Sequence, residues 1–166
     1  MNTNNLIILV STKFYNLKLK IMELKTVLTT ISERWKYKLD ETSPGVFRLD
    51  VAMKQTDGSL RYQYVYAWLI KERYHGKDAF YFNSRCGVYT PNINLYQMLK
   101  ESSYCTYCSV IITNDKKLDG TPCESIVVHA IQPVELTNEA ILNEVIWDIA
   151  TNADIIEKNY FGGDNN

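Results

Sequence analysis

The chain has 166 residues, of which 46% are hydrophobic and 22% are charged, and its formal net charge is −1 at pH 7. This composition is typical of one globular domain with a core of its own and argues against disorder or a membrane span. The longest apolar run, Leu6 to Val10, is too short to cross a bilayer, and no basic residues precede it as in a signal peptide. A near-neutral chain also lacks the basic footprint of a nucleic-acid-binding protein. We therefore expect a cytoplasmic protein with no membrane or nucleic-acid partner.

The N-terminal part of the chain divides near Met22. Residues 1–21 show no clean hydrophobic period, and we interpret them as poorly structured or as an extension. Residues 22–163 are expected to form a single α+β domain, followed by a short tail at 164–166. Apolar residues at steps of three and four predict a first helix from Met22 to Trp35.

A period of two then predicts three antiparallel strands. In the first, Phe47, Leu49, Val51 and Met53 alternate with mainly polar residues, which is typical of a half-buried strand. Asp57-Gly58 predicts a tight turn into a second strand at residues 60–70. A turn at His75-Gly76 leads to a third strand at residues 79–88.

The last part of the chain predicts a short helix at residues 92–101, two strands at 105–113 and 124–132, and a long helix at 137–163. The long helix has one apolar stripe, formed by Leu142, Ile146, Ile149, Ala153, Ile156 and Tyr160. The predicted order is helix-βββ-helix-ββ-helix. It indicates an α+β fold in which an antiparallel sheet of about five strands packs against the long C-terminal helix.

The second strand is the most aromatic part of the chain. Tyr62, Tyr64, Tyr66 and Trp68 share one face of it, because side chains alternate along a strand. The simpler interpretation is that this face is core beneath a helix. The alternative is that part of it is exposed and binds a partner, since tyrosine and tryptophan are enriched at interfaces. These four residues are our candidates for partner binding.

Cysteine and histidine give little support to catalysis or metal binding. Cys105 and Cys108 form a C-x-x-C pair, but a strand would send side chains three residues apart to opposite faces. We expect reduced, packed cysteines, with a redox or metal site as the alternative. His129 lies among apolar residues, and we interpret it as structural. No nucleotide-binding, hydrolase or metalloprotease motif occurs, so we expect no catalytic residue, cofactor or metal.

The element order resembles a known family. A leading helix, a three-stranded meander, a short helix, two strands and a long terminal helix look like the type III secretion chaperone-like fold, and most closely like the YbjN-like proteins of bacteria. The resemblance covers about residues 22–161 and lies in element order, acidic balance and size. It implies a cytoplasmic homodimer that binds another polypeptide without catalysis or cofactor.

Three functions are compatible with these observations. The leading hypothesis is a non-enzymatic protein-binding module, a chaperone or adaptor, that holds an extended segment by strand addition or pocket contacts. The alternative is a binder of a lipid or metabolite with a helix-grip fold, in which an apolar cavity lies beneath the long helix. A third hypothesis is a catalytic domain that uses His129 with a nearby acid.

Overall fold

The computed structural model describes residues 20–21 and 23–162; the expectations for residues 1–19, Met22 and 163–166 lie outside this part of the chain. An N-terminal helix, described at residues 20–21 and 23–35, comes first. It is followed in order by β1 (Lys38–Ser43), β2 (Val46–Lys54), β3 (Leu60–Tyr74), β4 (Lys77–Val88), α2 (Leu95–Glu101), β5 (Ser109–Lys116), β6 (Pro122–Pro133) and α3 (Glu139–Tyr160). The predicted α+β class, with a long C-terminal helix on an antiparallel sheet, is confirmed.

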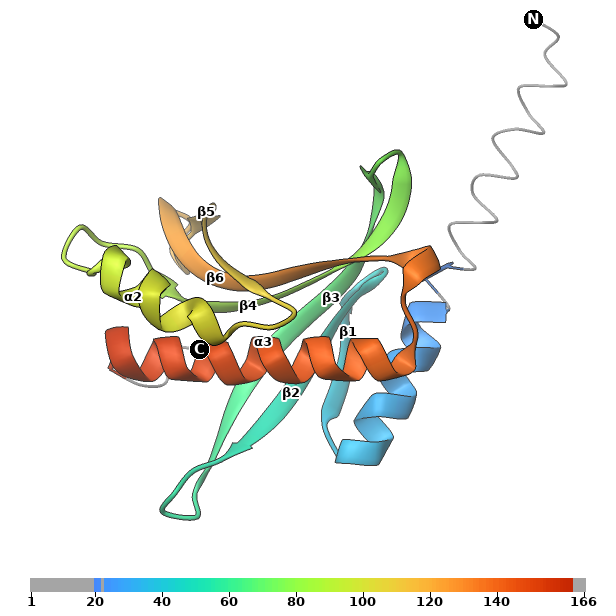
Figure 1. Ribbon diagram of the computed structural model, residues 1–166, viewed down its shortest axis with the longest axis horizontal. Helices are drawn as coiled ribbons and strands as arrows, with labels where there is room; N and C mark the ends of the chain where they lie inside the picture. The colour runs from blue at the N-terminus through green and yellow to red at the C-terminus, as the bar shows by residue number, and fades with distance from the viewer. Residues whose placement is uncertain (1–19, 22, 163–166) are drawn as a thin grey trace, which may run out of the picture.

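The sheet has six strands in the order β1-β2-β3-β4-β6-β5, and every neighbouring pair is antiparallel (Figure 1). Strands β1 to β4 form a continuous meander, and β6 lies between β4 and β5. The additional strand is β1, whose sequence carries charges and hydroxyls in place of alternating apolar residues. Its pairing with β2, which places Leu39 opposite Leu49, defines it as a strand.

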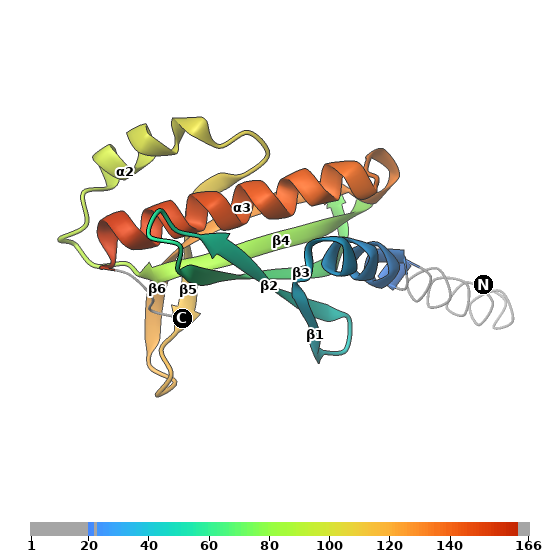
Figure 2. The ribbon, with the colours of Figure 1, turned by 90° about the horizontal axis from the view of Figure 1, so that it is seen from below.

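The helices of the described chain leave one face of the sheet open. Helix α3 packs on β2, β3, β4 and β6, and in Figure 2 both α2 and α3 lie above the sheet while no described helix covers the lower face of β3 and β4. The N-terminal helix lies beside the first turns of α3 (Figure 1). It is joined there by an ion pair between Arg34 and Glu139.

Helix α3 supplies much of the core through the predicted apolar stripe. Asn138 caps its first turn, because the side-chain Oδ1 accepts a hydrogen bond from the N–H of Ile141 at 3.0 Å. The residues of α3 that are buried against the sheet include Leu142, Val145, Ile146, Ile149, Ala153 and Ile156. They pack with inward-facing residues of the strands, among them Phe47, Leu49, Val65, Phe82, Ile126 and Val128. The layer between α3 and the sheet is therefore filled with apolar side chains.

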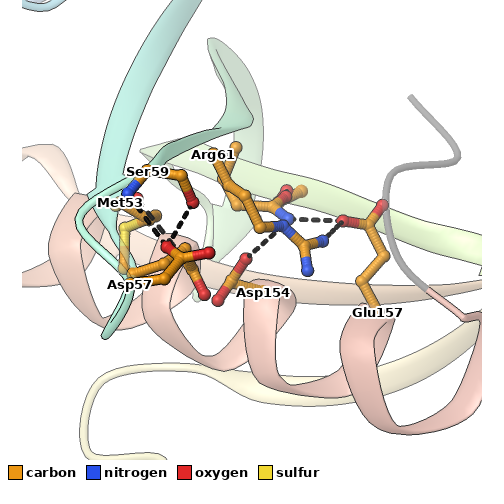
Figure 3. Close-up of polar contacts among 9 residues, drawn as sticks. Met53, Asp57, Ser59, Arg61, Asp154 and Glu157 are labelled. Atoms are coloured by element: carbon orange, nitrogen blue, oxygen red, sulfur yellow. Dashed lines mark hydrogen bonds and ion pairs between the residues drawn. The ribbon is translucent and has the colours of Figure 1, made fainter.

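A polar cluster interrupts this core near the C-terminal end of α3 (Figure 3). The guanidinium of Arg61 on β3 lies between two carboxylates of α3, with Nε 3.1 Å from Asp154 Oδ1 and Nη2 3.3 Å from Glu157 Oε2. Glu157 is fully buried and also accepts a hydrogen bond from Gln63 Nε2 at 2.6 Å, while Ser84 Oγ donates to Gln63 Oε1 at 3.1 Å. Because buried charges need partners, this cluster fixes the position of α3 along β3 and β4.

Candidate partner-binding face

The aromatic face of β3 lies on the open side of the sheet. On the opposite side of the strand Gln63, Val65 and Ala67 are fully buried toward α3. Tyr62 is 47% exposed, and Tyr64, Tyr66 and Trp68 are partly exposed. The simpler expectation, that this face is core beneath a helix, is therefore wrong. Val65 and Ala67 are the residues of β3 that face α3, and alternation along the strand places the aromatic residues on the other face.

A hollow of about 440 Å³ crosses the open face beside Tyr66 and Trp68. Strand register explains its lining: Trp68 lies opposite Tyr81, and Tyr66 lies opposite Asn83. The remaining lining residues are Arg85 on β4, Thr113, Asn114 and Asp115 on β5, and Val127 on β6. The rings of Trp68 and Tyr81 are in contact, with centroids 4.6 Å apart. Partial burial raises the pKa of Tyr81, so its hydroxyl is a neutral hydrogen-bonding group at physiological pH.

We define the partner-binding face as the open-face residues of this hollow together with the predicted aromatic residues: Tyr62, Tyr64, Tyr66, Trp68, Tyr81, Asn83, Arg85, Thr113, Asp115 and Val127. The structure brings two of the four predicted residues, Tyr66 and Trp68, into the hollow. Tyr64 lies outside the hollow beneath the guanidinium of Arg48, whose Cζ is 4.9 Å from the ring centroid. Tyr62 lies farther along β3, opposite Ala52.

The charges on this side of the sheet are largely paired with one another. Arg85 Nε lies 2.8 Å from Asp115 Oδ2, and the buried Ser125 hydroxyl donates to the same carboxylate oxygen at 2.7 Å. Burial opposes ionisation of Asp115, but the hydrogen bonds from Ser125 and from the N–H of Lys116, together with the Arg85 guanidinium, lower the pKa of Asp115 below its usual value. Attraction to this face therefore comes from aromatic surface and hydrogen-bonding groups more than from net charge.

His129 lies next to the hollow on β6. Its ring contacts Tyr81, with centroids 5.5 Å apart, and its buried Nδ1 has no hydrogen-bond partner among the described residues. Burial lowers the pKa of the imidazole, which favours the neutral form. None of the described hydrogen bonds or ion pairs links His129 to an acid, as the catalytic hypothesis would need.

The two edges of the sheet differ in character. Edge strand β1 is short, carries charges and has an irregular register between Glu41 and Ser43, features that discourage strand addition. Edge strand β5 carries the run Val110-Ile111-Ile112-Thr113 and pairs with β6 on one side alone within the described chain. Ile112 is 41% exposed. The accessible edge therefore adjoins the hollow, because β5 forms the edge and its residues Thr113, Asn114 and Asp115 also line the hollow.

The C-x-x-C pair has a different geometry from the one expected. Strand β5 begins at Ser109, so Cys105 to Cys108 form a bend, and the two thiols lie within hydrogen-bonding contact of each other. The prediction of opposite faces is wrong because Asp148 on α3 holds the bend: its Oδ2 accepts the N–H groups of Thr106 at 3.0 Å and Tyr107 at 2.6 Å. Burial raises the pKa of both thiols, which disfavours reactive thiolates.

No family model matches the chain, and no curated protein matches it. Within residues 20–21 and 23–162, no three His, Cys, Asp or Glu side chains are grouped so that they could hold a metal ion. No helix in this part of the chain has the length and apolar character needed to span a membrane.

Sequence reasoning missed the residues that complete the hollow. Tyr81, Asn83 and Arg85 alternate along β4, and this period of two was a usable signal for their sharing one face. Their alignment with Trp68 and Tyr66 depends on the β3–β4 register, and the contribution of Thr113 and Asp115 depends on β6 being inserted between β4 and β5. The turn at His75-Gly76 indicated that β3 and β4 pair, but the irregularity between Ile70 and Tyr74 shifts their register, and the insertion of β6 has no local signal.

Proposed function

We propose that this protein is a non-enzymatic protein-binding module, a chaperone-like or adaptor protein, that holds an extended segment of another polypeptide. The observation that carries the proposal is the position of an aromatic, uncovered sheet face beside an open, apolar strand edge. Aromatic residues on a rigid sheet offer a large contact area at low entropic cost.

The edge of β5 favours a polypeptide over other ligands. An exposed strand edge offers a row of backbone N–H and C=O groups, and another strand has the matching groups at the same spacing. A strand added along β5 would direct every second side chain to the open face, toward Thr113, Asp115 and the hollow. Backbone pairing would then supply affinity, and Thr113 and Asp115 would contact the nearest side chains of the added strand. The residues of the polypeptide that follow this strand would lie in the hollow against Trp68 and Tyr81.

Binding of an unfolded polypeptide tests this proposal. The probe is fluorescently labelled, reduced and carboxymethylated α-lactalbumin, a chain that cannot refold, and the measurement is its anisotropy as protein is added. Trp68→Ala and Tyr81→Ala should each weaken binding by about 30-fold, because central aromatic residues of an interface contribute about 2 kcal/mol or more.

Tyr96→Ala is the matched control, because Tyr96 is 77% exposed on α2, away from the sheet face. It should bind the probe as the unaltered protein does. Equal weakening by all three substitutions, or no binding by the unaltered protein, would overturn the proposal. Circular dichroism of each variant checks that the fold is retained.

A small-ligand binder is the second candidate, and the volume of the hollow on the open face favours it. The helix-grip hypothesis expected an apolar cavity beneath the long helix. In the structure Phe47, Phe82 and Leu142 fill that space as packed core. A ligand would instead lie against Trp68 and Tyr81. A small molecule that copurifies in native mass spectra and is lost in Trp68→Ala, with no binding of the unfolded probe, would favour this candidate.

The homodimer implied by the family resemblance also belongs to this proposal. The β5 edge is self-complementary in principle, because two antiparallel copies of the same strand can pair about a two-fold axis. Analytical ultracentrifugation at increasing protein concentration, with and without the unfolded probe, distinguishes dimerisation through the β5 edge from addition of a partner strand to it. A dimer that dissociates when the unfolded probe binds would mean that both compete for β5.

A further inference from the structure

A second hollow, of about 250 Å³, lies on the helical side of the molecule where the N-terminal helix meets α3. Its lining consists of Trp35 at the end of the N-terminal helix, Tyr37 just after that helix, and Asn143, Glu144 and Trp147 from α3. The proposed function uses none of these residues, and they lie on the side of the sheet opposite the partner-binding face.

Local structure holds the lining residues in place. Lys36 takes a left-handed conformation with φ of 58°, and the N–H of Tyr37 donates to the carbonyl of Ser32 at 2.9 Å, which fixes the direction in which the chain leaves the helix. Trp35 Nε1 donates to Asn143 Oδ1 at 2.7 Å. Because Asn143 and Trp147 are four residues apart on α3, they lie on one side of that helix.

Three aromatic rings border the hollow. Trp35 is 52% exposed and Trp147 is 47% exposed, while partial burial raises the pKa of Tyr37. Among the described ring contacts, none joins two of these three rings, so the space between them is open. The indole N–H of Trp35 already has its partner in Asn143, so the exposed part of the ring offers a ligand aromatic, apolar surface.

A carboxylate gives the hollow a charge preference. Glu144 lies in the lining, and its Oε1 accepts a hydrogen bond from Asn143 Nδ2 at 3.2 Å, which orients the carboxylate. The neighbouring cation, Arg34, is paired with Glu139. An anionic ligand would be repelled by Glu144, whereas a cation would be attracted by the carboxylate and by the negative faces of the rings.

We propose that this hollow binds a quaternary methylammonium group. Such a cation is weakly hydrated and cannot donate a hydrogen bond, so aromatic surface beside one carboxylate suits it. A primary ammonium would lose more hydration and would need several acceptors, of which the lining offers the Glu144 carboxylate, because the oxygen of Asn143 is engaged by Trp35. This site is a binding site in addition to the proposed function.

A comparison of matched ligands tests the charge requirement. Choline and its neutral isostere 3,3-dimethylbutan-1-ol have nearly the same shape and differ in the central cation. Titrations use the Trp68→Phe variant, in which Trp35 and Trp147 are the remaining tryptophans, with intrinsic fluorescence and ligand-observed NMR as independent readouts. Choline should bind about tenfold more tightly than the isostere, because cation–π contacts with several half-exposed rings and attraction to Glu144 add up to this scale.

Variants then assign binding to the hollow. Trp147→Leu should abolish the NMR signal of bound choline, and Glu144→Gln should weaken binding several-fold and reduce its dependence on salt. Tyr96→Ala, an exposed aromatic on α2, should leave binding unchanged. Both altered side chains of the hollow are at the surface, so circular dichroism should show an intact fold.

The source of the cation is distinguished by a third probe. A peptide containing trimethyllysine, beside the same peptide with unmodified lysine, shows whether the group is recognised on a polypeptide or as a free solute. Binding of choline or of the trimethylated peptide, lost in Trp147→Leu, supports the site. Equal binding of choline and its isostere, or no binding of choline and the trimethylated peptide alike, refutes it.

Discussion

Replacement of Arg61 by methionine should destabilise the fold strongly, because Arg61 is the cation of the buried cluster at the C-terminal end of α3. Its side chain is 15% exposed, that of Asp154 is 12% exposed and that of Glu157 is fully buried. Methionine retains much of the volume of the arginine stem but leaves two carboxylates without their guanidinium partner.

The magnitude follows from burial. Removal of one partner of a buried ion pair costs about 3–5 kcal/mol, most of it from the charge left unpaired. The expected loss is near the lower value, because Gln63 still donates to Glu157 at 2.6 Å after the substitution. A loss of about 3 kcal/mol corresponds to a decrease in Tm of roughly 6–12 °C for a chain of this length.

The assay is urea unfolding followed by circular dichroism. Lys25→Met, which breaks the exposed pair with Glu41, is the control and should leave the free energy of unfolding nearly unchanged. The double variant Arg61→Met with Glu157→Gln should be more stable than Arg61→Met alone, because the amide removes one buried charge and still accepts the hydrogen bond from Gln63. A loss below about 1 kcal/mol for Arg61→Met, or strictly additive effects in the double variant, would falsify this account of the cluster.

Two further predictions concern pH. The Tyr160 hydroxyl donates to Glu101 at 2.7 Å, and desolvation together with this bond raises the pKa of Tyr160 to about 12. Its contribution to stability should therefore be complete below pH 10 and be lost as pH rises from 10 to 12. Tyr160→Phe should lose less stability over this range than the unaltered protein in thermal unfolding, and the loss that remains should come from Tyr37 and Tyr81, whose pKa values are also raised. Burial lowers the folded-state pKa of His129 below 6.5, so the unfolded chain binds a proton first as pH falls. The stability of the fold should therefore decrease below pH 6.5 in thermal unfolding. The same decrease in a His129→Gln variant would show that His129 is not its cause.

Much of the fold was predictable from local patterns. The stripe from Leu142 to Ile156 predicted the buried face of α3, and the alternation from Phe47 to Met53 predicted β2, because both patterns extend over several repeats. Strand β1 was missed since its polar residues carry no period, and its existence depends on pairing with β2. The bend at Cys105 was missed because a carboxylate distant in sequence, on Asp148, holds it.

The candidate site was predictable in part. Alternation placed Tyr62 to Trp68 on one face of a strand, but the side of the sheet that receives α3 is decided by packing. Val65 and Ala67 face α3 and are fully buried, whereas the four aromatic residues lie on the other face, and alternation by itself gives no preference between the two faces. The cavity between Trp35 and Trp147 arises from two helices that meet only in the folded chain, so no local pattern marked it.

The most direct test of the partner-binding proposal is hydrogen exchange of the protein with and without saturating unfolded α-lactalbumin. The account predicts slower exchange of backbone amides in β5, where an added strand would pair, together with protection of the β3 and β4 segments around Trp68 and Tyr81. Helix α2 should exchange at the same rate in both samples. Protection confined to the helical side of the molecule, or no protection of β5, would contradict the proposal.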